Sequence, residues 1–262
     1  MTKTADGLTR VRIKGLASIA DVEFRPGRLS VLIGPNGSGK SNILRALSLA
    51  PQLRTGSLQR FVADAGGAAG LLHYGPKQTS VIELELEFQQ GERRNLYRAR
   101  LGHAAGDALI FLDEVAGYDD GKHEETPFHE TSMGAGHRES LLKEVKNESP
   151  TNKSVNYWLG QLTFFHFHDT SATSALRSNA RAVDDRFLRS NGSNLAAYLL
   201  RLAESEEEAY AKAWRRINRY ILKLAPCIKE LAPTRVGDRG SAVRLDWIDD
   251  CDERFGVHQL SD

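Results

Sequence analysis

Cysteine is scarce in this chain of 262 residues, which contains only Cys227 and Cys251. Two cysteines provide neither a disulfide framework nor a zinc knuckle, and they suit a reducing compartment. No stretch approaches the roughly 18 consecutive apolar residues of a membrane helix, and the N-terminus lacks the apolar core of a signal peptide. We therefore expect a soluble, cytoplasmic protein that makes no membrane contact.

The chain also lacks an excess of either charge. It has 35 Lys and Arg against 34 Asp and Glu, a formal net charge of +1. No global basic field points to nucleic acid, although composition does not describe how the charges are arranged. With 40% hydrophobic and 26% charged residues, the sequence can form an ordinary globular core.

The N-terminal half is dominated by strand patterns. Alternating apolar and polar residues predict strands at 9–13, 19–24, 81–88, 96–101 and 108–115, the last three forming an antiparallel meander. The run Leu29-Ser-Val-Leu-Ile33 is almost wholly apolar, which predicts a strand buried on both faces of a parallel or mixed sheet. A helix is expected over residues 41–49, ended by Pro51.

The remainder is more mixed. Residues 116–153 are polar and predict a surface insert with one short helix at 139–145, followed by a β-like run at 162–167. Helices are expected at 194–202, capped by Ser193 or Asn194, and after a capping box at residues 205–208. The second of these helices should end at Pro226, and the strands 227–236 and 242–248 should form a hairpin.

The eight residues Gly34-Pro-Asn-Gly-Ser-Gly-Lys-Ser41 match G-x-x-x-x-G-K-[ST] at every specified position. Small or conformationally permissive residues let a backbone wrap around a phosphate with its N–H groups pointing inward, and a following helix adds its positive N-terminal end. Lys40 should reach the β- and γ-phosphates, and the Ser41 hydroxyl should bind Mg²⁺. A loop between a strand and an amphipathic helix is the context this motif requires. The sequence therefore predicts a site for ATP and Mg²⁺.

A family resemblance follows from the form of this loop. The segment Gly34-Pro-Asn36-Gly37-Ser38-Gly39-Lys40-Ser41-Asn42 resembles the opening of the RecF/SMC-type ABC ATPases, and Asn42 makes it more specific than a generic phosphate loop. Within that group the chain resembles the bacterial predicted-ATPase branch, related to the overcoming-lysogenisation-defect ATPases. Supporting segments lie at 165–171, 188–195 and 255–262, so the resemblance extends over nearly the whole chain.

The resemblance implies a dimer of ATPase heads with each nucleotide sandwiched between two subunits. One face supplies the phosphate loop, and the other supplies a signature loop whose serine caps the γ-phosphate. Leu260-Ser261-Asp262 resembles the beginning of that signature, which implies that Ser261 acts in trans. An effector or nuclease partner is compatible with this family, and DNA contact is left open.

The chain departs from the family after this point. The signature helix, the Walker B strand with its acidic pair, and the switch histidine would all follow residue 262. Leu109-Ile-Phe-Leu-Asp113-Glu114 imitates a Walker B strand, but it precedes the signature, so a strand end in the meander is the favoured interpretation. We expect a shortened ATPase, a fragment or half of a split protein, for which nucleotide binding is plausible and efficient hydrolysis is not.

Two further groups have competing interpretations. His166, His168 and Asp169 could form part of a metal cluster, but no further ligands are evident. By family comparison, His168 or Asp169 would instead be Q-loop-like sensors of Mg²⁺ and the γ-phosphate, and the residues 169–171 could equally cap a helix.

A basic neighbourhood that includes Trp214 and Tyr220 could contact DNA, although a solvated helix face is the favoured interpretation. Its cations are Arg186, Arg189, Arg215, Arg216 and Arg219.

The fold class expected is α/β: an ABC-type P-loop head with a mixed core sheet, an antiparallel β-meander and a partial helical lobe. Residues 1–262 would be the N-terminal part of one head, divided into core and meander (1–115), polar insert (116–153), and Q-loop-like segment with helical lobe (154–262). The leading function is an ATPase head that dimerises around Mg-ATP and drives a process of the DNA-repair or phage-defence type. A non-hydrolysing regulatory subunit completed by a partner chain is the alternative, and a P-loop kinase is less consistent with Asn42.

Overall fold

The computed structural model describes residues 6–121, 128–142, 149–165, 167, 171, 173–256 and 259. The chain divides into two compact units, Met1–Thr163 and Phe164–Asp262. Both contain helices and strands, as the α/β expectation requires. Among the helices described, none has both the length and the apolar character needed to cross a membrane.

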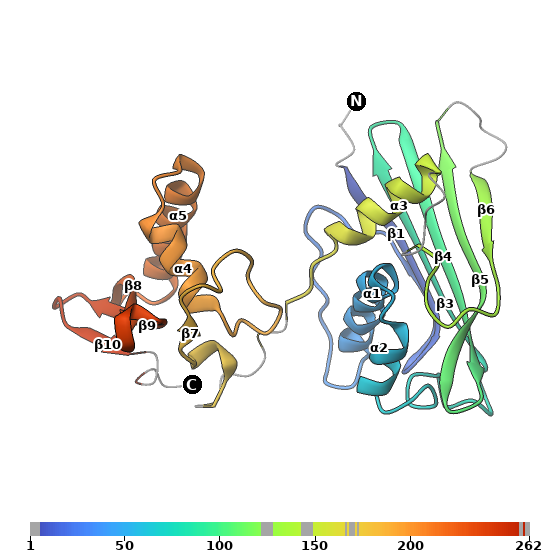
Figure 1. The fold of residues 1–262 in the computed structure, drawn as a ribbon, viewed down its shortest axis with the longest axis horizontal. Coiled ribbons are helices and arrows are strands. Elements are labelled where there is room, and N and C mark those ends of the chain that lie inside the picture. Colours follow the sequence, from blue (N-terminus) through green and yellow to red (C-terminus); the bar gives the residue numbers. More distant parts are fainter. Residues whose placement is uncertain are drawn as a thin grey trace. The chain divides into compact units, whose positions relative to one another are not determined.

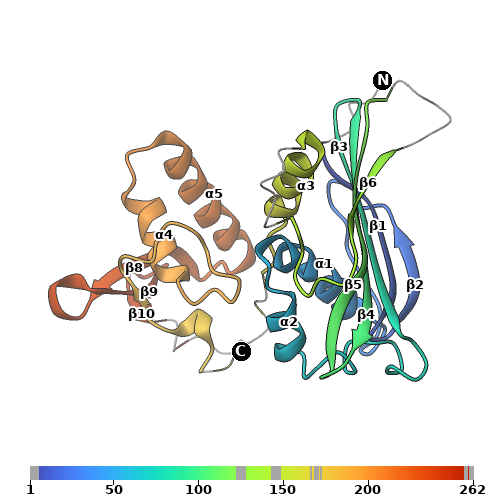
Figure 2. The same cartoon turned by 45° about the vertical axis from the view of Figure 1, so that its right-hand side comes forward.

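The first unit is a twisted sheet covered by helices. Its six strands are ordered β2-β1-β3-β4-β5-β6, and every neighbouring pair is antiparallel. The helices α1, α2 and α3 lie on one face of this sheet (Figure 2). The strands are β1 (Gly7–Leu16), β2 (Ile19–Phe24), β3 (Val81–Gln90), β4 (Arg93–Ala104), β5 (Ala108–Asp119) and β6 (His129–Gly134). The helices are α1 (Lys40–Thr55), α2 (Leu58–Asp64) and α3 (Pro150–Gln161).

Strand β3 shows why this sheet forms. Its even-numbered positions from Ile82 to Phe88 are buried in the core, and the glutamates at 83, 85 and 87 face the other side. There the Arg10 guanidinium on β1 bonds to Glu85 and Glu87 and lies 2.9 Å from Glu23 on β2. These carboxylates, Glu23 first, raise the pKa of Arg10 above its ordinary range, although partial burial acts in the opposite direction. Cross-strand charge pairs of this kind favour one register over a slipped one.

The second unit contains a smaller antiparallel sheet in which β8 and β9 form the predicted hairpin. Helices α4 and α5 pack against each other, and both contact β8. Figure 1 shows these elements in orange and red. Their bounds are β7 (Ala180–Arg181), α4 (Leu195–Glu204), α5 (Glu208–Leu224), β8 (Ile228–Val236), β9 (Ala242–Asp249) and β10 (Arg254–Gly256), with short 3₁₀ turns at Ala175–Arg177 and Asp238–Gly240.

The prediction of a buried strand at residues 29–33 is wrong. The segment is irregular, and Leu29 and Ile33 are 85% and 89% exposed. A strand is stabilised by hydrogen bonds to neighbours, and no strand of the described residues pairs with this one. For the same reason the expected mixed sheet is replaced by antiparallel sheets.

Helix α1 continues through Pro51, where the prediction ended it. The helix gains burial by continuing, because Leu53 is fully buried beyond the proline. It ends at Gly56, which is left-handed (φ 62°), while Ser57 N–H bonds to the carbonyl of Gln52. A glycine in this conformation is a common helix stop.

Several smaller expectations also fail. Residues 139–142 form no helix, and the rest of the expected 139–145 helix lies outside the described residues. Helix α3 forms instead at residues 150–161, where no helix was expected, and only its first four residues belong to the polar insert. It forms because Val155 and Leu159 are buried and Trp158 stacks on Phe88. Among the described residues of 162–167 no strand is present.

The predicted helix caps are only partly right. Asn194 occupies the N-cap position of α4 but makes no capping bond, since its amide donates to the carbonyls of Asp184 and Phe187. The N-cap of α5 is Glu207, and Ser205 Oγ accepts from its N–H, so the predicted capping box is absent. Both side chains stabilise the preceding loop, an alternative that asparagine and serine share with capping.

Candidate functional site

The predicted phosphate loop leads directly into helix α1. Gly37 and Gly39 have φ values of 85° and 93°, a region that side chains other than glycine rarely adopt. Gly39 is the N-cap residue, and Lys40 begins the helix. The glycines therefore allow the chain to fold back on itself just before the helix, as the motif predicts.

The Lys40 ammonium closes this loop on itself. Its Nζ donates to the carbonyls of Gly34 and Pro35 at 2.7 and 2.8 Å and lies 3.3 Å from Ser38 Oγ. The Ser38 N–H also bonds to the Pro35 carbonyl at 3.2 Å. The lysine charge is thus held within the curve of the loop, where an anion entering the loop would meet it.

The start of α1 is left open by the protein. No side chain caps it, and its first turn contains no acidic residue. Within the described residues, no acceptor is bonded to the backbone N–H of Gly39, Lys40 or Ser41. Such N–H groups, together with the helix dipole, attract an anion. The exposed residues Ser38 and Ser41 offer hydroxyls beside them. The donor set fits a triphosphate with a hard cation, for which a hydroxyl oxygen is a suitable ligand.

Asn42 connects the loop to the sheet. Its side-chain amide donates to Ser18 Oγ at 2.8 Å, in the turn between β1 and β2. The same hydroxyl lies 3.0 Å from the position that a Cβ on Gly39 would occupy. The neighbouring Ala17 has φ 50°, and its carbonyl contacts His73 Nδ1 at 2.7 Å. Ser18 is a functional candidate that the sequence did not reveal, since a serine in a short turn carries no motif.

The acidic pair that imitates Walker B lies elsewhere. Glu114 is fully buried on β5. Its carboxylate accepts from Tyr97 Oη at 2.7 Å, from the Leu141 N–H at 3.0 Å and from Ser140 Oγ, and it lies 3.0 Å from His137 Nε2. Asp113 accepts from Ser132 on β6 at 2.9 Å. Both carboxylates are therefore hydrogen-bonded within the antiparallel meander, as the favoured interpretation expected, but they lie in the middle of β5 and not at its end.

The environment of Glu114 also affects Tyr97. Burial, followed by the nearby Glu114 charge, raises the pKa of the Tyr97 hydroxyl well above its ordinary value of 10.0. The phenol therefore stays protonated and donates to the carboxylate. This network has the features of a structural core group, closed to solvent.

Several predicted site residues fall outside the described residues. These are His166, His168, Asp169 and Ser261. Of the basic neighbourhood, Arg215, Arg216 and Arg219 lie together on α5. Arg189 lies in the loop before α4 and pairs with Asp184 at 2.7 Å. The structure thus brings part of this group together.

One family comparison bears on the site. Residues 29–116 match a family model described as "AAA domain, putative AbiEii toxin, Type IV TA system". The match supports a P-loop ATPase-type family. It includes the whole loop from Gly34 to Ser41 and extends through Ala116 on β5. No curated protein matches the chain.

Proposed function

We propose that this chain binds Mg-ATP through residues 34–41. The observation that carries the proposal is the open start of α1, whose first N–H groups have no acceptor among the described residues and adjoin the Lys40 ammonium. A polyphosphate supplies the acceptors and negative charge that this arrangement lacks. The match of residues 29–116 to an AAA-domain family supports the same function.

Each residue has a distinct role in this proposal. The backbone from Gly37 to Ser41 would surround the β-phosphate, and Lys40 would exchange its carbonyl contacts for phosphate oxygens. The Ser41 hydroxyl would bind Mg²⁺, which supplies positive charge between the phosphate oxygens. Asn36, Ser38 and Asn42 would position the loop around the phosphates, Asn42 through its contact with Ser18.

The experiment compares Mg-ATP binding by the wild type and by Lys40→Ala, using a fluorescent ATP analogue. A charge-assisted hydrogen bond contributes about 1.5–3 kcal/mol, so the variant should bind roughly 10- to 150-fold more weakly. Lys77→Ala removes an exposed lysine from the same unit and should bind like the wild type. Unchanged affinity of Lys40→Ala would reject the proposal.

We further propose that the chain is an ATPase head that dimerises around Mg-ATP, with Ser261 of each copy capping the nucleotide of the other. This assembly, serving a process of the DNA-repair or phage-defence type, is what the resemblance to RecF/SMC-type ATPases implies. ATP should then shift the chain from monomer to dimer in light scattering. Ser261→Arg should block the dimer while ATP binding is retained, and an ATP-independent oligomeric state would contradict this assembly.

A second candidate is a nucleotide-binding regulatory subunit that does not hydrolyse ATP. The observation that favours it is that the carboxylates of Asp113 and Glu114 accept hydrogen bonds from side chains of the sheet, Ser132 and Tyr97, and not from a nucleotide site. Measured ATP turnover decides between the two. Turnover by the purified chain that Lys40→Ala abolishes would exclude the regulatory candidate, and binding without turnover would support it.

A further inference from the structure

Helix α5 has a strongly cationic composition within a chain that is nearly neutral. Its 17 residues include five cations and a single carboxylate, Glu208. The cations are Lys212, Arg215, Arg216, Arg219 and Lys223. The local charge of this helix is therefore about +4, compared with +1 for the whole chain.

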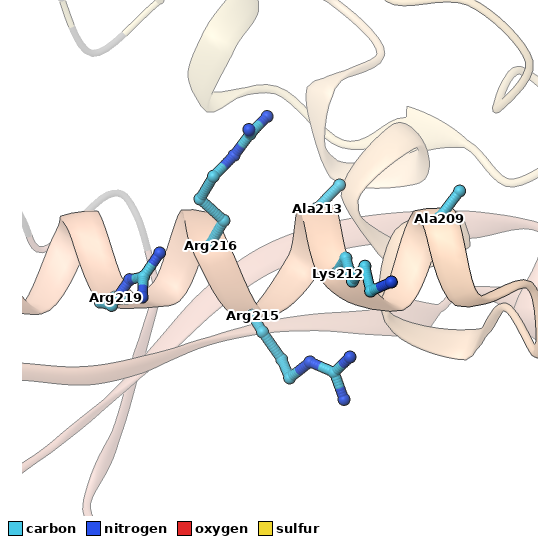
Figure 3. A pocket seen from close by; sticks show the side chains of 6 residues that line it. All are labelled: Ala209, Lys212, Ala213, Arg215, Arg216 and Arg219. Carbon is cyan, nitrogen blue, oxygen red and sulfur yellow. The ribbon is translucent and has the colours of Figure 1, made fainter.

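Four of these cations share one face. At about 100° per residue, positions 212, 216, 219 and 223 fall within an arc of roughly 60°, and they span about 16 Å along the helix axis. We name Lys212, Arg216, Arg219 and Lys223 the cationic face. Three of its members line a pocket with Arg215, and Figure 3 shows Arg215 and Arg216 diverging to opposite sides of the helix. The face is a row of charges with Arg215 at its edge.

Most of this charge is not neutralised by the protein. Glu208 lies 3.5 Å from Lys212 and 3.1 Å from Arg215, so one carboxylate serves two cations. In the part of the chain that the structure describes, no carboxylate pairs with Arg216, Arg219 or Lys223, and all three are exposed. Exposed, unpaired cations in a row repel one another, and an external polyanion relieves that repulsion.

The opposite face of α5 is already occupied. Trp214, Ile217 and Ile221 lie about 180° away from the cationic face and are partly buried where α5 packs on α4 and β8. Asn218 fixes this orientation, since its Oδ1 accepts from the Leu231 N–H on β8 at 2.9 Å. An amphipathic helix that binds a lipid surface inserts its apolar face. Here that face is largely used within the unit. The large apolar side chains of α5 that stay exposed, Tyr220, Leu222 and Leu224, lie on both sides of the cationic face and form no single apolar stripe.

We infer that the cationic face binds the phosphate backbone of duplex DNA without regard to sequence. Duplex DNA carries one charge per roughly 1.7 Å of axis, so about nine phosphates lie along 16 Å. Guanidinium groups suit phosphate oxygens because they can donate two parallel hydrogen bonds. The four members of the face include no amide side chain or aromatic ring, although the exposed Tyr220 lies beside it, about 40° from Arg216 around the helix. The row of cations therefore predicts contact mainly with the backbone. This inference does not depend on the proposed nucleotide site.

The test uses the full chain and two labelled duplexes of about 25 base pairs with unrelated sequences. Fluorescence anisotropy gives the Kd over a series of salt concentrations. The triple variant Arg216→Gln, Arg219→Gln, Lys223→Gln should weaken binding to both duplexes by roughly tenfold or more at about 100 mM salt. Each lost phosphate contact lowers the slope of log K against log salt by about 0.9, so the slope should fall by about 2–3.

The matched control removes the same charge from the first unit: Lys14→Gln, Arg60→Gln, Lys77→Gln, all exposed positions. It should bind DNA like the wild type, and thermal melting should show all three proteins folded. The inference is overturned if both triple variants lose affinity equally, or if the α5 variant keeps wild-type binding. It is also overturned if phosphatidylserine vesicles or polyglutamate, rather than DNA, require the cationic face.

Discussion

The side-chain amide of Asn42 donates a hydrogen bond to Ser18 Oγ across 2.8 Å, and so joins the first turn of α1 to the turn between β1 and β2. The helix start beside the phosphate loop is thereby fixed to the sheet. This contact gives a structural meaning to the asparagine that follows the Lys-Ser pair of the motif.

A double-mutant cycle of Asn42→Ala and Ser18→Ala measures this link. Each single variant should lose about 0.5–1.5 kcal/mol of Mg-ATP binding free energy, a roughly 2- to 12-fold change in Kd. Because both substitutions remove the same bond, the double variant should be little worse than either single one. Fully additive losses would show that the two residues act separately.

The Ser41 hydroxyl is expected to bind Mg²⁺. Ser41→Ala should therefore weaken ATP binding in the presence of Mg²⁺ and leave binding in the presence of a chelator nearly unchanged. Ser48→Ala is the control, because Ser48 lies further along the same helix and its hydroxyl donates to the Arg45 carbonyl at 2.8 Å. Titration with a fluorescent ATP analogue at several Mg²⁺ concentrations measures the difference. An equal loss with and without Mg²⁺ would assign Ser41 to the phosphates.

Glu114 is expected to stabilise the fold and to take no part in hydrolysis. Glu114→Gln replaces a buried acceptor with an amide whose NH₂ faces donors, which should lower the free energy of unfolding by about 2–4 kcal/mol. Asp113→Asn, which changes a carboxylate that is only partly buried, should cost less than about 1 kcal/mol. Chemical denaturation measures both. A catalytic Glu114 would give the opposite pattern, with normal stability and lost ATP turnover.

Asp107 should make the free energy of unfolding depend on pH in the acidic range. Its carboxylate accepts from the Ala69 N–H at 2.8 Å and lies 3.1 Å from His103 Nε2, and these contacts, Ala69 first, lower its pKa from the ordinary value of 3.8. A lowered folded-state pKa gives stability that is present above 3.8 and is lost as the pH falls through the folded value. Asp107→Asn should therefore show a shallower loss of unfolding free energy between about pH 5 and 3. Identical acid profiles would contradict this role.

The sequence by itself determined the elements whose signals are local. The alternation of apolar and polar residues in β1, β2, β3 and β4 sets which side chains face the core. Because its period is two residues, the same pattern predicts both that a strand forms and which of its faces is buried. The glycines at 37 and 39, followed by Lys40 and Ser41, predicted the conformation of the loop because only glycine adopts those φ values without strain. The α4–α5 and β8–β9 elements followed from periodicity and turn residues in the same way.

Only the tertiary structure decided the features that depend on distant partners. Residues 29–33 have the composition of a buried strand, but burial requires neighbouring strands, and none lies beside them among the described residues. Helix α1 passes Pro51 because Leu53 is buried beyond it, which no local rule predicts. Glu114 is a core residue because the fold brings Tyr97, His137 and Ser140 to its carboxylate. Asn42 bonds to Ser18, which lies 24 positions earlier in the sequence. Local chemistry thus specified the phosphate loop, and long-range packing specified what supports it.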